Sequence, residues 1–516
     1  MPNWIKIFRE RGIEALLPLE LANGMCFLVA REVWNNRVGF ILAAIGSSVG
    51  LGNIWRFSYV AYENGGGAFL IPFFVALLTA GIPLMILEFG IGSKFLGSAP
   101  ISLKRANKSF EWIGWWGVIA SFIITTYYSV IVGWSLVYLL KAFTLGWGAD
   151  TGAFFNNELL NVSDSPWNLG NFSYPVLIGL LATWLIIWVI EKKGVQAGIE
   201  RSSKIFIPLL WILLIVLVLR AITLEGSING IEWYLKPDFS KLTDIKVWQA
   251  AYGQAFYSLS LGMAIMITYS SYLPKKSDIV NNAFIVSLAD GAFSFTMGFA
   301  IFGTLGYMAY AKGVGIEEVV AQSIGLAFVV LPEALNMLPG FKALTAVAFF
   351  MCIVIAALSS LISLVEAFAS SLMDKFEMKR GRAVDLTIGF GLLFSLIYAT
   401  RAGIYWLDII DHFINTYGLI IVGILETVAI GWIYGADKIR EWANNHSDIK
   451  ARIWWVICIK VIIPVILLYI VYTDTLSNLA TPYEGYDPAA LMIGAGVIVL
   501  GILISFLMPF INKEVK

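Results

Sequence analysis

The sequence is poor in charge, in cysteine and in histidine, and each shortage excludes a class of protein. Only 14% of the 516 residues are charged, against about 25% in soluble domains. Basic and acidic residues balance to a formal net charge of zero, so there is no electrostatic case for nucleic acid as a partner. Three cysteines provide no disulfide framework. The two histidines, His412 and His446, are far apart and belong to no metal-ligand motif.

Hydrophobic residues are abundant instead: they make up 59% of the chain, with a mean hydropathy of +0.79. Twelve apolar segments are long enough to cross a bilayer as helices. They lie near residues 38–63, 68–95, 112–143, 174–191, 203–222, 247–272, 281–311, 342–374, 383–400, 405–434, 452–473 and 489–511. The composition therefore predicts an all-α, polytopic membrane protein with lipid as a partner. Hydroxyl residues that lack a nearby histidine do not form a nucleophilic catalytic site, and the sequence has no phosphate-binding glycine loop. Both observations argue against an enzyme.

Basic residues predict the orientation of these segments. If the chain starts inside, the inner loops carry clusters such as Lys379, Arg380 and Arg382, whereas the outer loops 144–173 and 474–488 carry none. Positive residues stay on the cytoplasmic side, so we expect a multi-pass protein of the cell (plasma) membrane with both termini cytoplasmic.

Two further segments are expected outside the spans. The outer loop 312–341 is expected to fold as short helices that cap the outside. Residues 1–30 form either a basic amphipathic surface helix or a dispensable leader, with Met25 as an alternative start.

The first apolar segment contains residues that do not suit a membrane helix. The stretch 46–57 reads GSSVGLGNIWRF. Each glycine costs about 1 kcal/mol of helix propensity, and an arginine at membrane depth costs at least a few kcal/mol. We interpret the segment as a broken helix, with free carbonyls near Ser48 that suit a cation and free amides near Leu51 that suit a carboxylate. Small residues could instead only ease helix packing, but that leaves Asn53 and Arg56 unexplained.

The sixth segment repeats this oddity, because Ser258-Leu259-Ser260-Leu261-Gly262 interrupts an otherwise good helix. The two breaks hold matching places in two halves of five helices, which predicts a 5+5 inverted repeat with a site at the midplane. The expected organisation is a leader (1–30), a first half with helices 1–5 (31–222), a second half with helices 6–10 (223–434), and helices 11–12 with the tail (435–516).

Several long motifs occur in order along the chain. They are NNRVGF at 35–40, GLGNIWRF at 50–57, ENGGGAF at 63–69, GIPL at 81–84, QAFYSLSLG at 254–262 and GADK at 435–438. They resemble the neurotransmitter:sodium symporter family over about residues 31–511, and most closely its bacterial transporters of leucine and other hydrophobic amino acids. The resemblance implies the leucine-transporter-like fold of about twelve helices. It also implies sodium-coupled symport by alternating access.

The resemblance implies two sodium sites built from hard oxygen ligands. The first uses Ser48, Asn53, Ser258 and Asp290, and the second uses Gly46, Val49, Ala356, Ser359 and Ser360. Serines in membrane helices also bond their own backbone, so Ser359 and Ser360 are only suggestive from sequence.

Asp290 departs from the family, which usually has a neutral amide at this position. Chloride-dependent members bind chloride beside it, and Phe73 replaces their coordinating tyrosine, although Gln254, Ser258 and Ser294 remain as in those members. A buried carboxylate repels a chloride strongly. We therefore predict chloride-independent transport, and Asp290 is a candidate to carry a proton back.

Gly50 predicts the class of substrate. Monoamine members of the family carry an aspartate at this position, so glycine implies a substrate that brings its own carboxylate, namely an amino acid. The resemblance places the substrate among Ser48, Gly50, Leu51, Gly52, Ile124, Tyr128, Tyr257, Ser258, Ser260, Met263, Ser360 and Leu364. Most side chains facing the substrate's own side chain are apolar, which predicts a neutral hydrophobic or aromatic amino acid. For Met263 and Leu364, ordinary helix packing is an equal alternative.

Two gates are implied on either side of this site. Arg56 faces Asp411 at the outer gate, although spacing alone would also allow Asp408. The inner gate comprises Arg31 and Asp374, with Trp34 and Tyr272 packed nearby; Arg31 could equally be an ordinary positive-inside residue.

Glu88 is expected to hydrogen-bond the exposed backbone of the two breaks. The rival interpretations are a same-fold cation-coupled carrier of another carboxylate-bearing solute, and a channel or receptor. The sequence does not indicate the oligomeric state.

Overall fold

The computed structural model describes residues 32–320 and 323–511. Within these ranges the chain is helical, with two isolated bridges, Gly66 to Pro237 and Phe172 to Thr400, and no strand. The prediction of an all-α protein is therefore confirmed. The leader predicted over residues 1–30 lies outside the described residues.

Ten stretches of the described chain are long and apolar enough to span a membrane. They are built on α4 (Gly67–Ala76) with α5 (Ile82–Phe95), α7 (Glu111–Ala142), α9 (Tyr174–Glu191), α10 (Arg201–Ile222), α14 (Ile279–Lys312), α17 (Lys342–Phe376), α18 (Arg380–Ser395), α19 (Gly403–Phe413) with α20 (Ile420–Glu426), α22 (Ile453–Ile457) with α23 (Ile463–Ala480), and α24 (Pro488–Leu507). A bent pair adds an eleventh. The predicted sixth segment is divided into two shorter helices, so the count of twelve stays a prediction.

The first predicted break is present. Helix α2 (Arg37–Ser48) starts at Asn36, whose side chain accepts a hydrogen bond from the Gly39 amide at 2.8 Å. It ends where Val49 turns extended, with ψ of 95°. The chain becomes helical again in η2 (Gly52–Arg56) and α3 (Phe57–Glu63), with the axis bent by 58°. The glycine-rich sequence and the polar residues at this point therefore produce a discontinuous helix.

The second break separates α12 (Ile245–Ser258) from α13 (Ile265–Ser270). Ser260, Gly262 and Ala264 have φ of 54°, 71° and 59°. Left-handed backbone costs an L-residue other than glycine roughly 1–2 kcal/mol, so other contacts must stabilise this turn. One is Glu88 of α5, whose Oε1 accepts a hydrogen bond from the Gly262 amide at 2.8 Å. This confirms the role expected of Glu88 at the second break.

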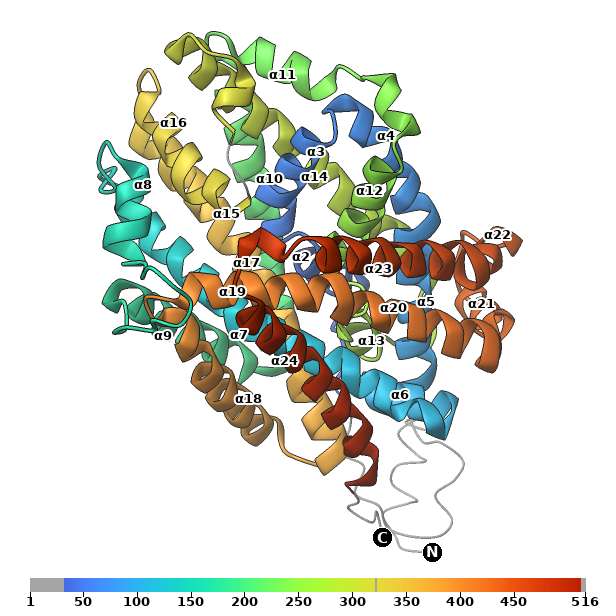
Figure 1. Ribbon diagram of the computed structural model, residues 1–516. Helices are drawn as coiled ribbons and strands as arrows, with labels where there is room; N and C mark the ends of the chain where they lie inside the picture. The colour runs from blue at the N-terminus through green and yellow to red at the C-terminus, as the bar shows by residue number, and fades with distance from the viewer. Residues whose placement is uncertain (1–31, 321–322, 512–516) are drawn as a thin grey trace, which may run out of the picture. The chain divides into compact units, whose positions relative to one another are not determined.

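The two divided helices lie side by side at the centre of the described bundle. Helix α2 packs against α13, and η2 packs against α12 (Figure 1). Helix α17 packs against both α2 and α7. The site described below therefore lies between the non-helical backbone of the two breaks and the two uninterrupted helices α7 and α17.

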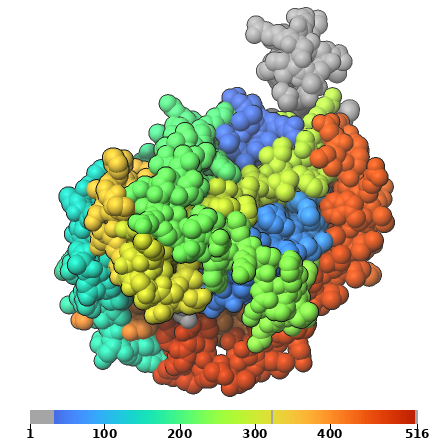
Figure 2. All heavy atoms as spheres, turned by 90° about the horizontal axis from the view of Figure 1, so that it is seen from above, coloured from blue at the N-terminus to red at the C-terminus, as the bar shows by residue number. Residues whose placement is uncertain are grey.

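One face carries short helices rather than spans. The loop expected to fold as short helices contains η8 (Ile316–Glu318), η9 (Leu326–Val330) and α16 (Leu331–Met337), which confirms that expectation. Seen from above, this segment (yellow) lies beside α11 (Ser227–Leu235, green) (Figure 2). Other short helices of the described chain are α6 (Ala99–Ala106), α8 (Thr151–Ala153) and α15 (Ser323–Gly325), and α21 (Ala436–Asn444) ends the stretch that begins with α19.

Candidate functional site

A cavity of about 40 Å³ lies where the two broken helices meet α7 and α17. Its lining comprises Ser47, Ser48, Gly50, Leu51, Gly52, Asn53, Ile124, Tyr128, Tyr257, Ser258, Ser260, Met263, Ser360 and Leu364. Every residue predicted to contact the substrate is in this set. The structure thus brings together residues from elements that are distant in sequence; their individual roles stay predictions.

One wall of the cavity is polar and is crowded around Gly50. A Cβ atom added to Gly50 would lie 2.7 Å from the Ser360 Oγ and 3.2 Å from the Tyr128 hydroxyl oxygen. The Tyr128 hydroxyl also accepts a hydrogen bond from the Leu51 amide at 3.4 Å. Only glycine leaves this part of the cavity open, and hydrogen-bonding groups surround the space.

Serine hydroxyls tie the first break to its two neighbours. The Ser260 hydroxyl, in the second break, donates to the Ser47 carbonyl at 3.0 Å. The Ser360 hydroxyl of α17 donates to the same carbonyl at 3.2 Å. A carbonyl freed at the end of α2 thereby finds partners on two other elements.

Three of the four residues predicted for the first sodium site, Asn53, Ser258 and Asp290, form a buried cluster with Ser294. The Ser258 hydroxyl donates to Asp290 Oδ2 at 2.7 Å. The Asn53 Nδ2 group lies 2.6 Å from Asp290 Oδ1 and 2.8 Å from the hydroxyl oxygens of Ser258 and Ser294. These four side chains are at most 3% exposed, so the Asp290 carboxylate meets polar protein groups and little solvent.

The orientation of Asn53 differs from its predicted role. Its Oδ1 accepts a hydrogen bond from the Gly50 amide at 2.8 Å, so its nitrogen faces the carboxylate. An oxygen ligand for a cation requires the amide to rotate by about 180°, exchanging its oxygen and nitrogen positions. The cluster thus has the carboxylate and hydroxyl oxygens that sodium favours. The Asn53 N–H group, however, points to the position that was predicted for the sodium ion.

The residues predicted for the second sodium site lie on α2, on the first break and on α17, and α2 packs against α17. Ser359 and Ser360 both donate to the Ala356 carbonyl, at 2.9 Å and 3.2 Å, which is the self-bonding typical of serines in helices. Ser360 in addition reaches the Gly46 carbonyl across the interface at 3.4 Å. A Cβ on Gly46 would lie 3.2 Å from the Ser359 Cβ, so α2 and α17 approach closely here. Val49, the fifth predicted member, is buried in the same break.

A second, wider cavity of about 520 Å³ lies on the Arg56 side of the site, with Arg56, Tyr257 and Asn415 in its lining. The Arg56 guanidinium lies over the Tyr257 ring, 4.3 Å from its centroid. It forms no ion pair with Asp411, whose Oδ1 accepts from the Asn415 amide group at 2.8 Å. In this structure the expected gate pair is therefore apart, and Tyr257 separates the wide cavity from the small one.

Asp408 has other partners. Its two carboxylate oxygens accept hydrogen bonds from the hydroxyls of Tyr483 and Tyr486, at 3.2 Å and 2.9 Å. This occupation leaves Asp411 as the better candidate to face Arg56, in agreement with the choice made from the family pattern.

Trp34 is buried against the second broken helix. The Trp34 indole donates to the Tyr269 carbonyl at 2.7 Å, and its ring packs edge-on against Tyr272 at 6.2 Å. Asp374 accepts a hydrogen bond from the Ser98 amide at 2.6 Å. Trp34 and Tyr272 therefore lie together as predicted, whereas Arg31 lies outside the described residues.

Sequence reasoning missed a charged cluster on this Trp34 side. Arg380 donates through both terminal nitrogens to Glu366, at 2.7 Å and 2.8 Å, and lies 3.6 Å from Glu191. The Tyr272 hydroxyl donates to the same Glu366 carboxylate at 2.5 Å. Glu366 and Glu191 are fully buried. Carboxylates inside apolar segments are a functional signal in membrane proteins, and this signal could have identified both residues.

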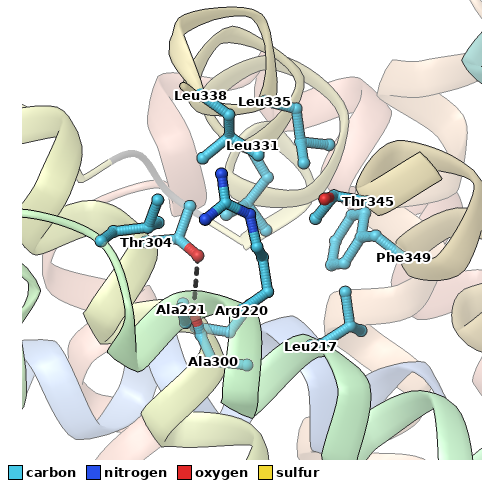
Figure 3. A pocket seen from close by; sticks show the side chains of 12 residues that line it. Leu217, Arg220, Ala221, Ala300, Thr304, Leu331, Leu335, Leu338, Thr345 and Phe349 are labelled. Atoms are coloured by element: carbon cyan, nitrogen blue, oxygen red, sulfur yellow. Dashed lines mark hydrogen bonds between the residues drawn. The ribbon is translucent and has the colours of Figure 1, made fainter. Parts of the chain in front are cut away.

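Another small cavity lies apart from this site, between α10, α14, α16 and α17 (Figure 3). It measures about 20 Å³, and apolar side chains such as Leu217, Leu331 and Leu335 surround Arg220 there. It shares no lining residue with the cavity between the broken helices. It is better interpreted as part of the packing around Arg220 than as a second substrate site.

Comparison with known proteins gives consistent matches. A model of the sodium:neurotransmitter symporter family matches residues 31–151 and 148–513. An uncharacterized sodium-dependent transporter of Methanocaldococcus jannaschii is 47% identical over 478 residues, which cover 93% of this chain and 97% of that protein. The human sodium- and chloride-dependent neutral and basic amino acid transporter B(0+) is 33% identical over 508 residues, covering 85% and 79%. The creatine transporter of Torpedo marmorata is 30% identical over 481 residues, covering 85% and 78%.

Proposed function

Because this chain belongs to the sodium:neurotransmitter symporter family, we propose that it imports a neutral hydrophobic or aromatic amino acid together with sodium by alternating access. The observation that supports this most directly is the cavity between the two broken helices. Its polar end holds the Ser360 and Tyr128 hydroxyls around Gly50. An apolar wall is provided by Ile124, Met263 and Leu364. Such a site fits a molecule with a charged head and an apolar side chain.

The carboxylate of the substrate would occupy the space beside Gly50. There it would meet the amides of Leu51 and Gly52, which start the second half of the broken helix, and the Tyr128 hydroxyl. Its amine would meet the carbonyls of Ser48, Tyr257 and Ser258 and the Ser260 hydroxyl. These groups are complementary in charge to the two ends of a zwitterion, which supports an amino acid over an amine.

The side chain of the substrate would lie against Ile124, Met263 and Leu364. The cavity is small, since a single water needs about 10–15 Å³ by the same measure. A bulky side chain therefore requires these residues to move, and methionine adapts readily because it is unbranched. A small neutral amino acid would need less rearrangement.

A second candidate is a same-fold cation-coupled carrier of another carboxylate-bearing solute. The names of the relatives support this second candidate, because one relative is a creatine transporter and others are glycine and GABA transporters. Each of those molecules carries a carboxylate, as the open space at Gly50 requires. The side-chain walls, rather than the carboxylate end, would then determine the solute.

We expect transport to be independent of chloride. Asp290 already places a carboxylate beside Asn53, Ser258 and Ser294. Two like charges about 4 Å apart repel by about 4 kcal/mol even at an effective dielectric constant of 20. Phe73 is buried against Phe57 and offers no hydroxyl to an anion. The fixed carboxylate would thus replace the chloride.

The first experiment is binding of a panel of radiolabelled amino acids, from glycine to tryptophan, to purified protein. Binding is compared in sodium and in potassium, each as the chloride and the gluconate salt. Sodium-dependent binding of a hydrophobic or aromatic amino acid, equal in both anions, supports the proposal. If none of the amino acids in the panel binds in sodium but creatine or GABA does, the second candidate is favoured.

The substitution Asp290→Asn tests the chloride argument separately. It replaces the carboxylate by the neutral amide that is usual in the family, so we expect sodium affinity to fall at least tenfold and chloride to increase substrate binding. The measurement is the sodium titration of substrate binding in chloride and in gluconate. A variant that keeps both the wild-type sodium affinity and the indifference to chloride would contradict the role given to Asp290.

A further inference from the structure

An open groove lies between the end of α21 and the start of α22, far along the chain from the substrate cavity. Its volume is about 550 Å³. Its lining comprises Arg440, Glu441, Asn444, Asn445, Lys450, Ala451, Arg452 and Ile453. The two helices lie together at one edge of the view in Figure 1. No residue of this groove lines the cavity between the broken helices.

The position of the groove places it at a membrane surface. The loop 445–452 directly joins two stretches long enough to span, Gly403–Asn444 and Ile453–Gly485. Ile453 and Ile457 at the start of the second stretch are 62% and 48% exposed, as expected of side chains that face lipid. Trp432 is 60% exposed, and the Lys460 ammonium lies 5.6 Å from the centroid of its ring. Tryptophan and lysine are typical anchors at the headgroup level.

The loop that forms the groove is held rigidly. The Asn444 side chain donates to the Ala451 carbonyl at 2.9 Å and accepts from the Ala451 amide at 2.8 Å. The Lys450 ammonium donates to the carbonyls of Asn444 and Ser447, at 2.7 Å and 2.6 Å. A site formed in advance loses less conformational entropy when a ligand binds.

The groove is mainly cationic. Three of its lining residues, Arg440, Lys450 and Arg452, are basic, and Glu441 is the acidic one. Arg440 pairs with Asp437 at 2.8 Å. Lys450 and Arg452 are exposed and form no ion pair with another described residue. Two positive charges at headgroup depth therefore lack an anion from the described part of the protein.

We propose that this groove binds the headgroup of an anionic phospholipid, with its phosphate held by Arg452 and Lys450, the two basic lining residues that have no ion pair among the described residues. The acyl chains would follow the exposed apolar side chains of Ile453 and Ile457. Guanidinium groups bind phosphate with two parallel hydrogen bonds, and basic residues next to a membrane surface attract anionic lipid. This inference concerns a lipid site and does not depend on the proposed substrate.

The test is native mass spectrometry of the full-length protein titrated with phosphatidylglycerol or phosphatidylcholine. The groove variant is Lys450→Gln with Arg452→Gln. The matched control is Lys379→Gln with Arg382→Gln, which removes the same charge from two exposed positions at the start of α18. A third variant, Glu441→Gln, makes the groove more positive. Inorganic phosphate is added in a separate arm as a competitor.

We expect wild-type protein and the control to retain phosphatidylglycerol over phosphatidylcholine. The groove variant should retain it at least fivefold less, and Glu441→Gln should retain it more. Equal loss in the groove and control variants would mean that basic residues attract anionic lipid without a specific site, and it would overturn the proposal. Displacement of the lipid by millimolar phosphate would overturn it as well, because the site would then bind phosphate rather than a lipid. The Glu441→Gln arm keeps the test valid if the double variant folds poorly.

Discussion

At the scale of single residues, Gly50 sets the chemistry of the cavity by having no side chain. The space that a Cβ would occupy lies between Ser360 and Tyr128, whose oxygens point toward it. Any side chain there would compete directly with a substrate carboxylate. In the proposed binding mode, Gly50 would therefore act through the room that it leaves, and not through flexibility.

Replacement of Gly50 by Ala should weaken substrate binding at least tenfold, because the methyl group would lie 2.7 Å from the Ser360 Oγ. The measurement is equilibrium binding of the substrate identified by the amino-acid panel. Gly389→Ala is the control, since a Cβ there meets nothing within 4 Å. Wild-type affinity in the Gly50 variant would show that the carboxylate lies elsewhere.

Asn53 illustrates a second effect of single residues. Its amide nitrogen faces Asp290 at 2.6 Å, in the place where a cation would lie. If sodium binds as proposed, an ionic contact between sodium and Asp290 would replace the hydrogen bond from Asn53 Nδ2 to Asp290. The Asn53 oxygen would then turn toward the ion. The Asp290→Asn variant tests this cluster by removing its one charged group.

At the scale of the elements, the two broken helices depend on neighbours for the hydrogen bonds that they lack. Glu88 of α5 bonds the Gly262 amide, and the hydroxyls of Ser260 and Ser360 bond the Ser47 carbonyl. Unpaired backbone groups are costly inside a membrane. The breaks are stable because α5 and α17 provide partners, which also couples the site to these helices.

Arg220 connects elements at another place. Its Nη2 donates to the carbonyls of Pro339 and Gly340, at 2.9 Å and 3.3 Å, and thereby ties the end of α10 to the turn before α17. A glutamine cannot reach both carbonyls, so Arg220→Gln should lower the free energy of unfolding by about 1–3 kcal/mol. The midpoint of thermal unfolding in detergent provides the measurement.

The control for Arg220 is Lys312→Gln, which removes the same charge near the same helices. Lys312 pairs with Glu333 at 2.7 Å, and both side chains are about a third exposed, at 35% and 37%. Exposed pairs contribute about 0–1 kcal/mol, so this variant should unfold close to the wild type. Equal destabilisation by the two changes would mean that charge, and not the link to the turn, explains the effect.

At the scale of the whole molecule, the two sides of the site differ. On the Arg56 side a cavity of about 520 Å³ reaches Tyr257, and Arg56 and Asp411 are not paired. On the Trp34 side, aromatic packing and the Glu366–Arg380 pair close the structure. Among the described residues, the wide cavity on one side of the site fits the alternating access proposed above.

Sodium and substrate together should raise the unfolding temperature, because they bind between elements that separate on unfolding. A ligand at 100 times its Kd stabilises by about 2.7 kcal/mol. The measurement is the midpoint of thermal unfolding in sodium with substrate, with potassium as the control for ionic strength. We expect the Gly50→Ala variant to show a smaller shift. The same shift in potassium would contradict coupling to sodium.

Much of this protein follows from local sequence properties. Apolar length predicts the spans, because a helix must cross a fixed thickness of hydrocarbon. Glycine and serine within such spans predict the two breaks, because helix propensity and the cost of buried backbone act over a few residues. The family motifs then predict the set of residues around the cavity, and the structure brings all of those predicted substrate contacts together.

Tertiary structure alone decided the rest, because it depends on contacts between distant parts of the chain. The orientation of Asn53 follows from the Gly50 amide, which donates to its Oδ1, and from Asp290, which accepts from its Nδ2. The separation of Arg56 from Asp411 is a property of one conformation, which no sequence pattern contains. The pairing of Arg380 with Glu366 depends on α17 and α18 packing together. The sequence by itself therefore determined the class of protein and predicted the residues that surround the cavity. The arrangement of its charges required three-dimensional packing.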